Sequence, residues 1–311
     1  MNNPKVNILM ATYNGSKYIE AQLDSIIQQT YDNIDIYIRD DGSTDNTVQV
    51  IEDYIQRNES NKSNKRIILL DNHGQNLRCP YSFYEIFRRC EPAKYYSMCD
   101  QDDVWYPEKI AWAVERLEQE DNDQVLVYYT ASDYCDGDGN LIRKSPQQKE
   151  NLQLTDVLYY TPGSGFTMLI NEAARKKLIL DVELGPELHD RWLIRGGVCF
   201  GKVIYEPRAT ASHIRHESAV TAGDAGNVNL LLNFLKSELA GDDAKKEKEA
   251  LRYFANAFEK ELSLEDKKVL RIFTKKNSLI GWFQKVFYPK RLRTRMGGEV
   301  ALRFLFGIGR I

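Results

Sequence analysis

Acidic residues gather at two places in the sequence where an apolar stretch ends. Asp40 and Asp41 stand at one of them, in RDDGSTDNT, and Asp100, Asp102 and Asp103 stand at the other, in CDQDDVW. Carboxylates this close repel one another, and a bound divalent cation is the usual way to offset that repulsion. Carboxylate oxygens suit Mg²⁺ or Mn²⁺. A solvated acidic loop without a ligand is the alternative, and the second cluster disfavours it.

The elements that would position these acids alternate between strand and helix. Segments with apolar residues at helical spacing separate four apolar runs of strand length, at 6–10, 34–38, 66–70 and 95–98. Residues 125–142 then predict a strand, a Gly/Asp turn and a short returning strand. This order predicts an α/β fold in which helices cover a mostly parallel sheet, whose ligands bind at the carboxyl ends of the strands. The strand ends that this rule selects are residues 12–15, 40–45 and 100–103.

The composition is that of an ordinary globular protein. The chain has 311 residues and a formal net charge of −3, which argues against a protein built to bind nucleic acid. No apolar run approaches the ~20 residues that span a bilayer. The N-terminus lacks the basic start and long apolar stretch of a signal peptide. Five cysteines form no CxxC pair, which favours a reduced, cytoplasmic protein and disfavours zinc.

The C-terminal part of the chain differs from the rest in charge and pattern. From about residue 224 the sequence becomes helical and highly charged, so we expect one domain at 1–223 and a helical region at 224–311. Residues 281–311 hold seven Lys or Arg against one Glu, interleaved with Trp, Tyr and Phe. This tail is either a helical bundle or an anchor on an anionic membrane surface, which favours cationic and aromatic side chains.

Five motifs follow one another along the chain. They are ATYNG at 11–15, IRDDGSTDNT at 38–47, CDQDDVW at 99–105, GSGF at 163–166 and HDRW at 189–192. In this order and spacing they resemble the inverting family 2 glycosyltransferases of GT-A fold, which is a Rossmann-like α/β architecture. The form CDQDDVWYPEKI and a late Arg-His element are most similar to bacterial rhamnosyltransferases that build cell-surface polysaccharides. The resemblance covers about residues 5–223, so it implies a GT-A domain over 1–223 followed by a C-terminal helical extension.

The resemblance implies a role for several residues at the nucleotide. Thr12 and Tyr13, after the first strand, would border the base, and Asp41 would accept a hydrogen bond from the pyrimidine. Asp100 would lie close to the ribose or to a metal-bound water. Asp102 would bind the metal, Mg²⁺ or Mn²⁺.

Other residues are predicted at the sugars and at the diphosphate. Asp190 takes the place of the family's catalytic base, although the residue before it is not the usual acid. Asp103, Gly165 and Trp192 are predicted beside the donor or acceptor sugar. The alternatives are that Asp103 supports the loop, that Gly165 belongs to a simple turn and that Trp192 is a core aromatic. His216 stands in register with a family histidine and is predicted as a ligand of the metal or diphosphate, with an ordinary loop histidine as the alternative.

The implied activity is metal-dependent transfer of L-rhamnose from dTDP-L-rhamnose to a hydroxyl of a cell-surface polysaccharide precursor, with inversion. A UDP-hexose donor is the alternative. A sugar nucleotidyltransferase is disfavoured because the loop ATYNGSKY has one glycine and no arginine, and retention of the acidic motifs disfavours a non-catalytic carbohydrate-binding relative. The expected partners are a nucleotide sugar, a glycan or lipid-linked glycan acceptor and an anionic membrane on its cytoplasmic face, but no nucleic acid.

Overall fold

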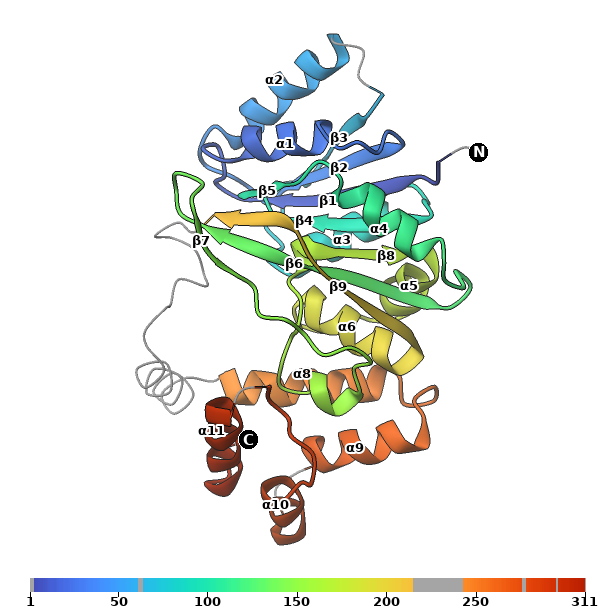
Figure 1. The fold of residues 1–311 in the computed structure, drawn as a ribbon, viewed down its shortest axis with the longest axis vertical. Helices are drawn as coiled ribbons and strands as arrows, with labels where there is room; N and C mark the ends of the chain where they lie inside the picture. Colours follow the sequence, from blue (N-terminus) through green and yellow to red (C-terminus); the bar gives the residue numbers. More distant parts are fainter. Residues whose placement is uncertain (1–2, 61–63, 215–242, 276–277, 295, 311) are drawn as a thin grey trace.

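The structure, a computed structural model, describes residues 3–60, 64–214, 243–275, 278–294 and 296–310 (Figure 1). The strands are β1 Val6–Thr12, β2 Ile34–Asp40, β3 Arg66–Leu70, β4 Tyr95–Cys99, β5 Asp103–Trp105, β6 Val125–Cys135, β7 Leu141–Lys144, β8 Met168–Asn171 and β9 Gly201–Ile214. The helices are α1 Ile19–Ile27, α2 Thr47–Ser60, α3 Tyr81–Arg89, α4 Lys109–Leu117, α5 Glu172–Arg175, α6 His189–Phe200, α8 Asp243–Ala257, α9 Leu264–Thr274, α10 Leu279–Val286 and α11 Met296–Gly307. The predicted site residue His216 and the predicted domain boundary at residue 223 lie outside the described residues.

The strands form one curled sheet with a common carboxyl edge. Their order is β3-β2-β1-β4-β8-β6-β9-β5, and β7 pairs with β6. The first four strands in sequence are mutually parallel, as are β6 and β9. Because β8 is antiparallel to both β4 and β6, the strands β6 and β9 run in the same direction as β1. The ends of all these strands therefore face one edge, where such sheets bind ligands.

Helices cover both faces of the sheet. On one face, Ile26 of α1, Ile51 of α2 and Leu117 of α4 belong to a hydrophobic cluster with buried strand residues. On the other face, Phe87 of α3 and Leu193 of α6 belong to a second cluster. The predicted α/β sheet covered by helices is thus confirmed, and its edge is free to carry loops.

The C-terminal helices extend the second of these layers. Figure 1 shows α8 to α11 grouped below α6, at the end of the molecule away from α1 and α2. The ring of Trp192 on α6 lies 5.2 Å from that of Phe254 on α8, between centroids. Leu305 and Phe306 of α11 are buried in the same cluster as the sheet residues. The predicted helical extension is confirmed from Asp243 onward, and it shares one core with the α/β part.

Three strands have no counterpart in the sequence-based prediction, namely β5, β8 and β9. The first two are three and four residues long, too short to show a period. Strand β9 contains Pro207, and proline usually argues against a paired strand. The pairing of β6 with β9 shifts here, from Thr130 opposite Glu206 to Ala131 opposite Ala209. Pro207 therefore lies in a bulge, outside the regular ladder.

The packing of α11 predicts a difference between two phenylalanines on that helix. Phe306 is fully buried, with its ring 5.6 Å from that of Tyr159, whereas the side chain of Phe304 is half exposed. Phe306→Ala should lower the free energy of unfolding by about 3–5 kcal/mol, because it leaves a cavity in the shared core. Phe304→Ala, the matched control, should change it by no more than about 0.5 kcal/mol. Urea unfolding followed by tryptophan fluorescence measures both, and equally small effects would contradict the docking of α11.

Candidate functional site

The first loop at the carboxyl edge is organised by Asp40, the last residue of β2. Its buried carboxylate accepts hydrogen bonds from the Thr12 hydroxyl, at 2.9 Å, and from the backbone N–H groups of Gly42 and Ser43, at 3.0 and 2.8 Å. These bonds fix the turn after β2 against the end of β1. Thr12 is therefore part of the frame of the site, since its hydroxyl is buried in this contact.

A second set of bonds joins the loop after β1 to the loop after β2. The backbone N–H of Asn14 donates to Ser43 Oγ, and its side-chain oxygen accepts from the N–H of Thr44, both at 2.8 Å. The N–H of Gly15 donates to Thr47 Oγ1 at 2.8 Å. These bonds join residues that are 29 to 32 positions apart in the sequence, so the two motifs form one rigid rim.

Gln101, which the sequence reasoning missed, ties the acidic loop to this rim. Its side-chain oxygen accepts from the Tyr13 N–H at 2.9 Å, and its amide donates to the Tyr13 carbonyl at 3.0 Å. A Cβ atom at Gly15 would lie 2.2 Å from the Gln101 oxygen, so only glycine leaves room for this contact. The pair holds the Tyr13 backbone while its side chain stays half exposed at the rim.

Asp41 is buried in an ionic network of its own. Its carboxylate pairs with Arg39 and accepts from the backbone N–H groups of Leu77, at 2.8 Å, and Arg78. Arg39 in turn donates to the Gln75 carbonyl at 2.8 Å. The network fastens the segment after β3 to the rim, and the described residues leave one lone pair of Asp41 Oδ2 without a donor. The predicted bond from Asp41 to a pyrimidine stays a prediction, and that lone pair is the one able to make it.

Asp103 belongs to the sheet and does not face a sugar. Strand β5 pairs with β9 so that Asp103 lies opposite His213, and the buried carboxylate is 2.7 Å from His213 Nδ1. The His213 ring stacks on Phe166, with centroids 5.6 Å apart and planes 17° apart. The predicted sugar contact of Asp103 is wrong because the pairing with His213 buries it. Its alternative role, support of the acidic loop, is what these contacts provide.

The acidic loop carries uncompensated negative charge. Burial and the charges of Asp103 and Asp102 raise the pKa of Asp100 well above its ordinary value, and Asp190 adds to this effect. Burial lowers the pKa of His213, but the hydrogen bond and charge of Asp103 outweigh it and the net pKa is raised. His213 therefore compensates Asp103, while Asp100 and Asp102 remain partly exposed and repel one another.

This crowding fits a divalent cation. Within the described part of the chain, no group of three His, Cys, Asp or Glu side chains is arranged to hold a metal alone. Mg²⁺ is usually bound through one or two carboxylates together with water and substrate phosphates, so Asp102 and Asp100 suffice as the protein's share. His216, the further predicted ligand, lies outside the described residues.

Asp190 stands in the first turn of α6, across from the acidic loop. Burial and the charges of Asp100, Asp190 and Asp41 raise the pKa of the Cys79 thiol to about 12. Each of these three carboxylates, drawn from three separate motifs, therefore lies close enough to Cys79 for its charge to act on the thiol. A buried ion pair between Arg195 and Glu187 holds the loop before α6 in place.

Gly165 and Trp192 pack in the interior, contrary to the sugar contacts predicted for them. A Cβ atom at Gly165 would lie 2.2 Å from Nε2 of His189, whose buried ring packs on Phe83 with centroids 4.4 Å apart. Burial lowers the pKa of His189, which keeps the ring neutral. Trp192 is fully buried and donates its indole N–H to the Leu178 carbonyl at 2.7 Å. Both residues pack in the interior close to the first turns of α6, which supports their alternative roles as a turn and a core aromatic.

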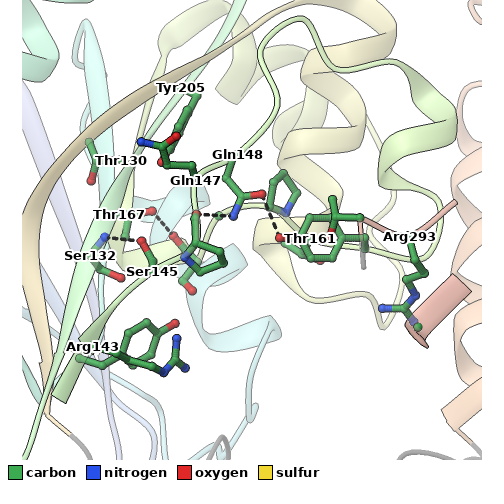
Figure 2. Close-up of a pocket in the computed structure, with 18 of the residues that line it drawn as sticks. Thr130, Ser132, Arg143, Ser145, Gln147, Gln148, Thr161, Thr167, Tyr205 and Arg293 are labelled. Carbon is green, nitrogen blue, oxygen red and sulfur yellow. Dashed lines mark hydrogen bonds between the residues drawn. The ribbon is translucent and has the colours of Figure 1, made fainter. Parts of the chain in front are cut away.

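A cavity of about 1150 Å³ opens beside this site, between the carboxyl end of β6, β7 and the segment before α11 (Figure 2). None of the predicted site residues lines it. Hydroxyls, amides and aromatic rings form much of the wall, and the Gln148 amide is oriented by the Tyr160 hydroxyl at 2.9 Å and the Pro146 carbonyl at 2.9 Å. Arg143 and Arg293 lie on opposite sides of the view in Figure 2. Such groups can bind sugar hydroxyls and stack on sugar rings.

Known proteins similar to this chain point to one enzyme family. The family model for glycosyl transferase family 2 matches residues 7–177. The chain is 32% identical over 196 residues to the dTDP-rhamnosyl transferase RfbG of Shigella flexneri, covering 59% of this chain and 63% of that protein. It is 32% identical over 193 residues to an uncharacterized glycosyltransferase of Haemophilus influenzae, covering 58% of this chain and 56% of that one. The chain thus spans less than two thirds of the length of either relative.

Solved structures share the fold at low sequence identity. S. aureus TarS in complex with UDP-GlcNAc is 16% identical with a TM-score of 0.55, over 98% of this chain and 91% of that chain. The mannosyltransferase PcManGT of Pyrobaculum calidifontis, in complex with GDP-Man and Mn²⁺, is 14% identical with a TM-score of 0.50, over 100% and 88%. At these identities the likeness concerns the fold alone, and it confirms the GT-A architecture implied by the motifs.

The two neighbouring acids of the loop should differ in what they do for stability. Asp103→Asn removes the charge that His213 pairs with inside the protein, so the free energy of unfolding should fall by about 1–3 kcal/mol. Asp102→Asn, partly exposed and without a hydrogen bond to any described residue, should change it by no more than about 0.5 kcal/mol. Denaturant unfolding at neutral pH compares them, and NMR titration should show a larger fall in the pKa of His213 in Asp103→Asn than in Asp102→Asn, because Asp103 contributes both a hydrogen bond and a charge. If Asp103→Asn unfolds at the wild-type denaturant concentration and the pKa of His213 is unchanged, the assigned pairing of Asp103 with His213 is wrong.

Proposed function

Because the chain belongs to glycosyl transferase family 2, we propose that it is a metal-dependent inverting glycosyltransferase acting on a glycan precursor of the cell surface. The observation that carries the proposal is that Asp41, Asp100 and Asp190, from three separate motifs, all lie near Cys79. A carboxylate for the nucleotide, one for the metal and one for the base are what direct displacement needs, because donor and acceptor must meet between the leaving group and the base.

We place the nucleoside diphosphate along the rim formed by the first two loops. The half-exposed Tyr13 side chain borders the base, and the remaining lone pair of Asp41 accepts from the pyrimidine N–H. Asp100 and Asp102 hold the divalent cation together with the diphosphate oxygens. The bound cation would neutralise the negative charge that builds on the diphosphate as it leaves. Support comes from the unrelieved repulsion within the acidic loop and from the Mn²⁺ in the PcManGT complex.

Asp190 takes the proton of the attacking hydroxyl. Its carboxylate stands in the first turn of α6, at the end of the helix that carries partial positive charge. An ionised carboxylate within hydrogen-bond reach of a hydroxyl is a competent general base. The adjacent His189 is unsuited to that role, since it is buried beneath the site. A single displacement with one base inverts the anomeric centre.

We propose L-rhamnose, carried on dTDP, as the donor sugar, which the likeness to the rhamnosyl transferase of Shigella flexneri supports. A UDP-hexose is the second candidate, which the UDP-GlcNAc complex of TarS favours. The acceptor glycan would occupy the cavity beside the site. Gly163 and Ser164 line that cavity, and Gly165 after them packs on His189, so the cavity adjoins the start of α6 and Asp190.

Removal of the proposed base tests the mechanism. Asp190→Asn keeps the shape of the side chain but accepts no proton, so turnover at saturating donor should fall by about 10²–10⁴-fold. Donor affinity should stay unchanged by calorimetry. Asp123→Asn removes an exposed carboxylate at the opposite edge of the sheet, before β6, and serves as the control with normal turnover. An Asp190→Asn variant that retains more than about a tenth of the wild-type rate would exclude it as base.

Donor and metal are tested together by thermal shift. The correct nucleotide sugar should raise the melting temperature by mass action, and more so with Mn²⁺ present. We expect dTDP-L-rhamnose to give a larger shift than UDP-glucose or UDP-GlcNAc. In Asp102→Asn the donor should still raise the melting temperature as it does without metal, but added Mn²⁺ should no longer increase the rise. If only a UDP-sugar raises the melting temperature, the donor is the second candidate, a UDP-hexose. If the rise is the same with and without Mn²⁺, the proposed metal dependence is wrong.

A further inference from the structure

Two rows of apolar side chains on the C-terminal helices face solvent. On α10 and just after it the row is Leu279, Phe283 and Phe287, and on α11 and just after it the row is Met296, Val300, Phe304 and Ile308. Each of these side chains is 50 to 81% exposed. A spacing of four residues keeps each row on one side of its helix. The exposure is therefore organised along both helices, unlike the scattered apolar residues of an ordinary surface.

The helices do not need these rows for folding. The opposite side of α11 is buried in the core through Leu302, Leu305 and Phe306. The two helices are joined to each other by the Trp282 indole N–H, which donates to the Gly307 carbonyl at 2.8 Å, and by Arg303, which donates to the Lys285 carbonyl at 2.8 Å. Both rows consequently belong to one end of the molecule, below α8 in Figure 1.

Positive charge surrounds the rows. Lys275, Lys290 and Arg291 are exposed near them. The one acid of residues 281–311, Glu299, is buried and accepts from the N–H groups of residues 292 and 293 at 2.8 Å while pairing with Arg303. Beneath α10, burial and the nearby Lys248 and Arg252 lower the pKa of Lys285 to about 8, which reports a concentration of cations. Residues 281–311 therefore present apolar and cationic side chains together with their one acid withdrawn, while the exposed Glu265 of α9 is an acid close enough to act on Tyr288.

We propose that the outer face of α10 and α11 docks on the surface of an anionic lipid bilayer. In the described residues, no helix is long and apolar enough to cross a membrane. Aromatic and aliphatic side chains at the headgroup boundary gain apolar burial, and each nearby Lys or Arg gains from the anionic surface. A second copy meeting this face through its own would set cations against cations, which opposes a symmetric dimer.

Docking has a consequence that rests on the proposed function. Residues 293, 294 and 296–298 form one wall of the cavity, and Met296 belongs to both that wall and the exposed row of α11. A docked molecule would hold the cavity next to the headgroups. A lipid-linked acceptor could then enter without leaving the bilayer. The docking itself does not depend on the identity of the reaction.

Vesicle binding by the full-length chain tests the proposal. The protein should sediment with equimolar phosphatidylglycerol–phosphatidylcholine vesicles at low salt, less so as salt rises, and not with phosphatidylcholine vesicles. Phe283→Ser/Phe287→Ser/Phe304→Ser should weaken binding about tenfold or more, through lost apolar burial. Lys290→Glu/Arg291→Glu should do the same through charge. The control Leu141→Ser/Ile142→Ser, which alters equally exposed residues on β7, should bind as the wild type does.

The readouts separate failure of docking from failure of folding or function. Hydrolysis of the donor in solution should be unchanged in the triple variant. Thermal unfolding should change little, because Phe283, Phe287 and Phe304 are at least half exposed, and the rings of Phe283 and Phe287 pack on each other and on Trp282 outside the two core clusters. Absence of wild-type binding to anionic vesicles at low salt would overturn the proposal, as would a triple variant that binds like the wild type. A wild-type dimer that the triple variant dissociates, without vesicle binding, would assign the face to self-association. Loss of donor hydrolysis in Asp190→Asn alone bears on the proposed function and not on docking.

Discussion

Mutual repulsion of carboxylates at one edge of the sheet is the constraint under which the site is arranged. Parallel strands deliver their ends to a common edge, and this sequence places acids at several of them. Backbone N–H groups satisfy Asp40, Arg39 neutralises Asp41, and His213 neutralises Asp103. Asp100, Asp102 and Asp190 form no ion pair with any described residue. The acids that hold the frame have either a basic side chain or several hydrogen-bond donors as partners, and the acids left for a ligand have no basic partner.

Sequence reasoning could predict the part of this arrangement that is local. Apolar runs and helical spacing predict the elements of the first third, because the side of each helix or strand that packs on the core is visible in its own sequence period. The acidic clusters are equally visible, because their members are neighbours in the sequence. The partners that decide the roles of these acids are not visible, since Gln101 bridges to a loop 88 residues away and Asp103 pairs with a histidine 110 residues away. No spacing rule connects residues that meet only when the sheet curls.

The errors have a similar physical origin. Trp192 was placed at a sugar because it follows Asp190 by two positions in a motif. Two steps along a helix rotate a side chain by roughly 200°, so one of the pair faces the core when the other faces the site. Gly165 was interpreted as room for a ligand, and the room is taken by His189. The cavity was invisible because its wall is drawn from residues scattered between 130 and 298.

The cavity wall formed by residues 293, 294 and 296–298 lies far along the chain from the acids at the sheet edge. The matched family segment ends at residue 177, so this wall lies outside the part of the chain that defines the family. Substitutions there would reshape the cavity while the acids at the sheet edge stay as they are. Under the proposed function, the recipient molecule would change with this wall while the donor chemistry is kept. Preference for one recipient would then reside in C-terminal residues, outside the segment that the family model matches.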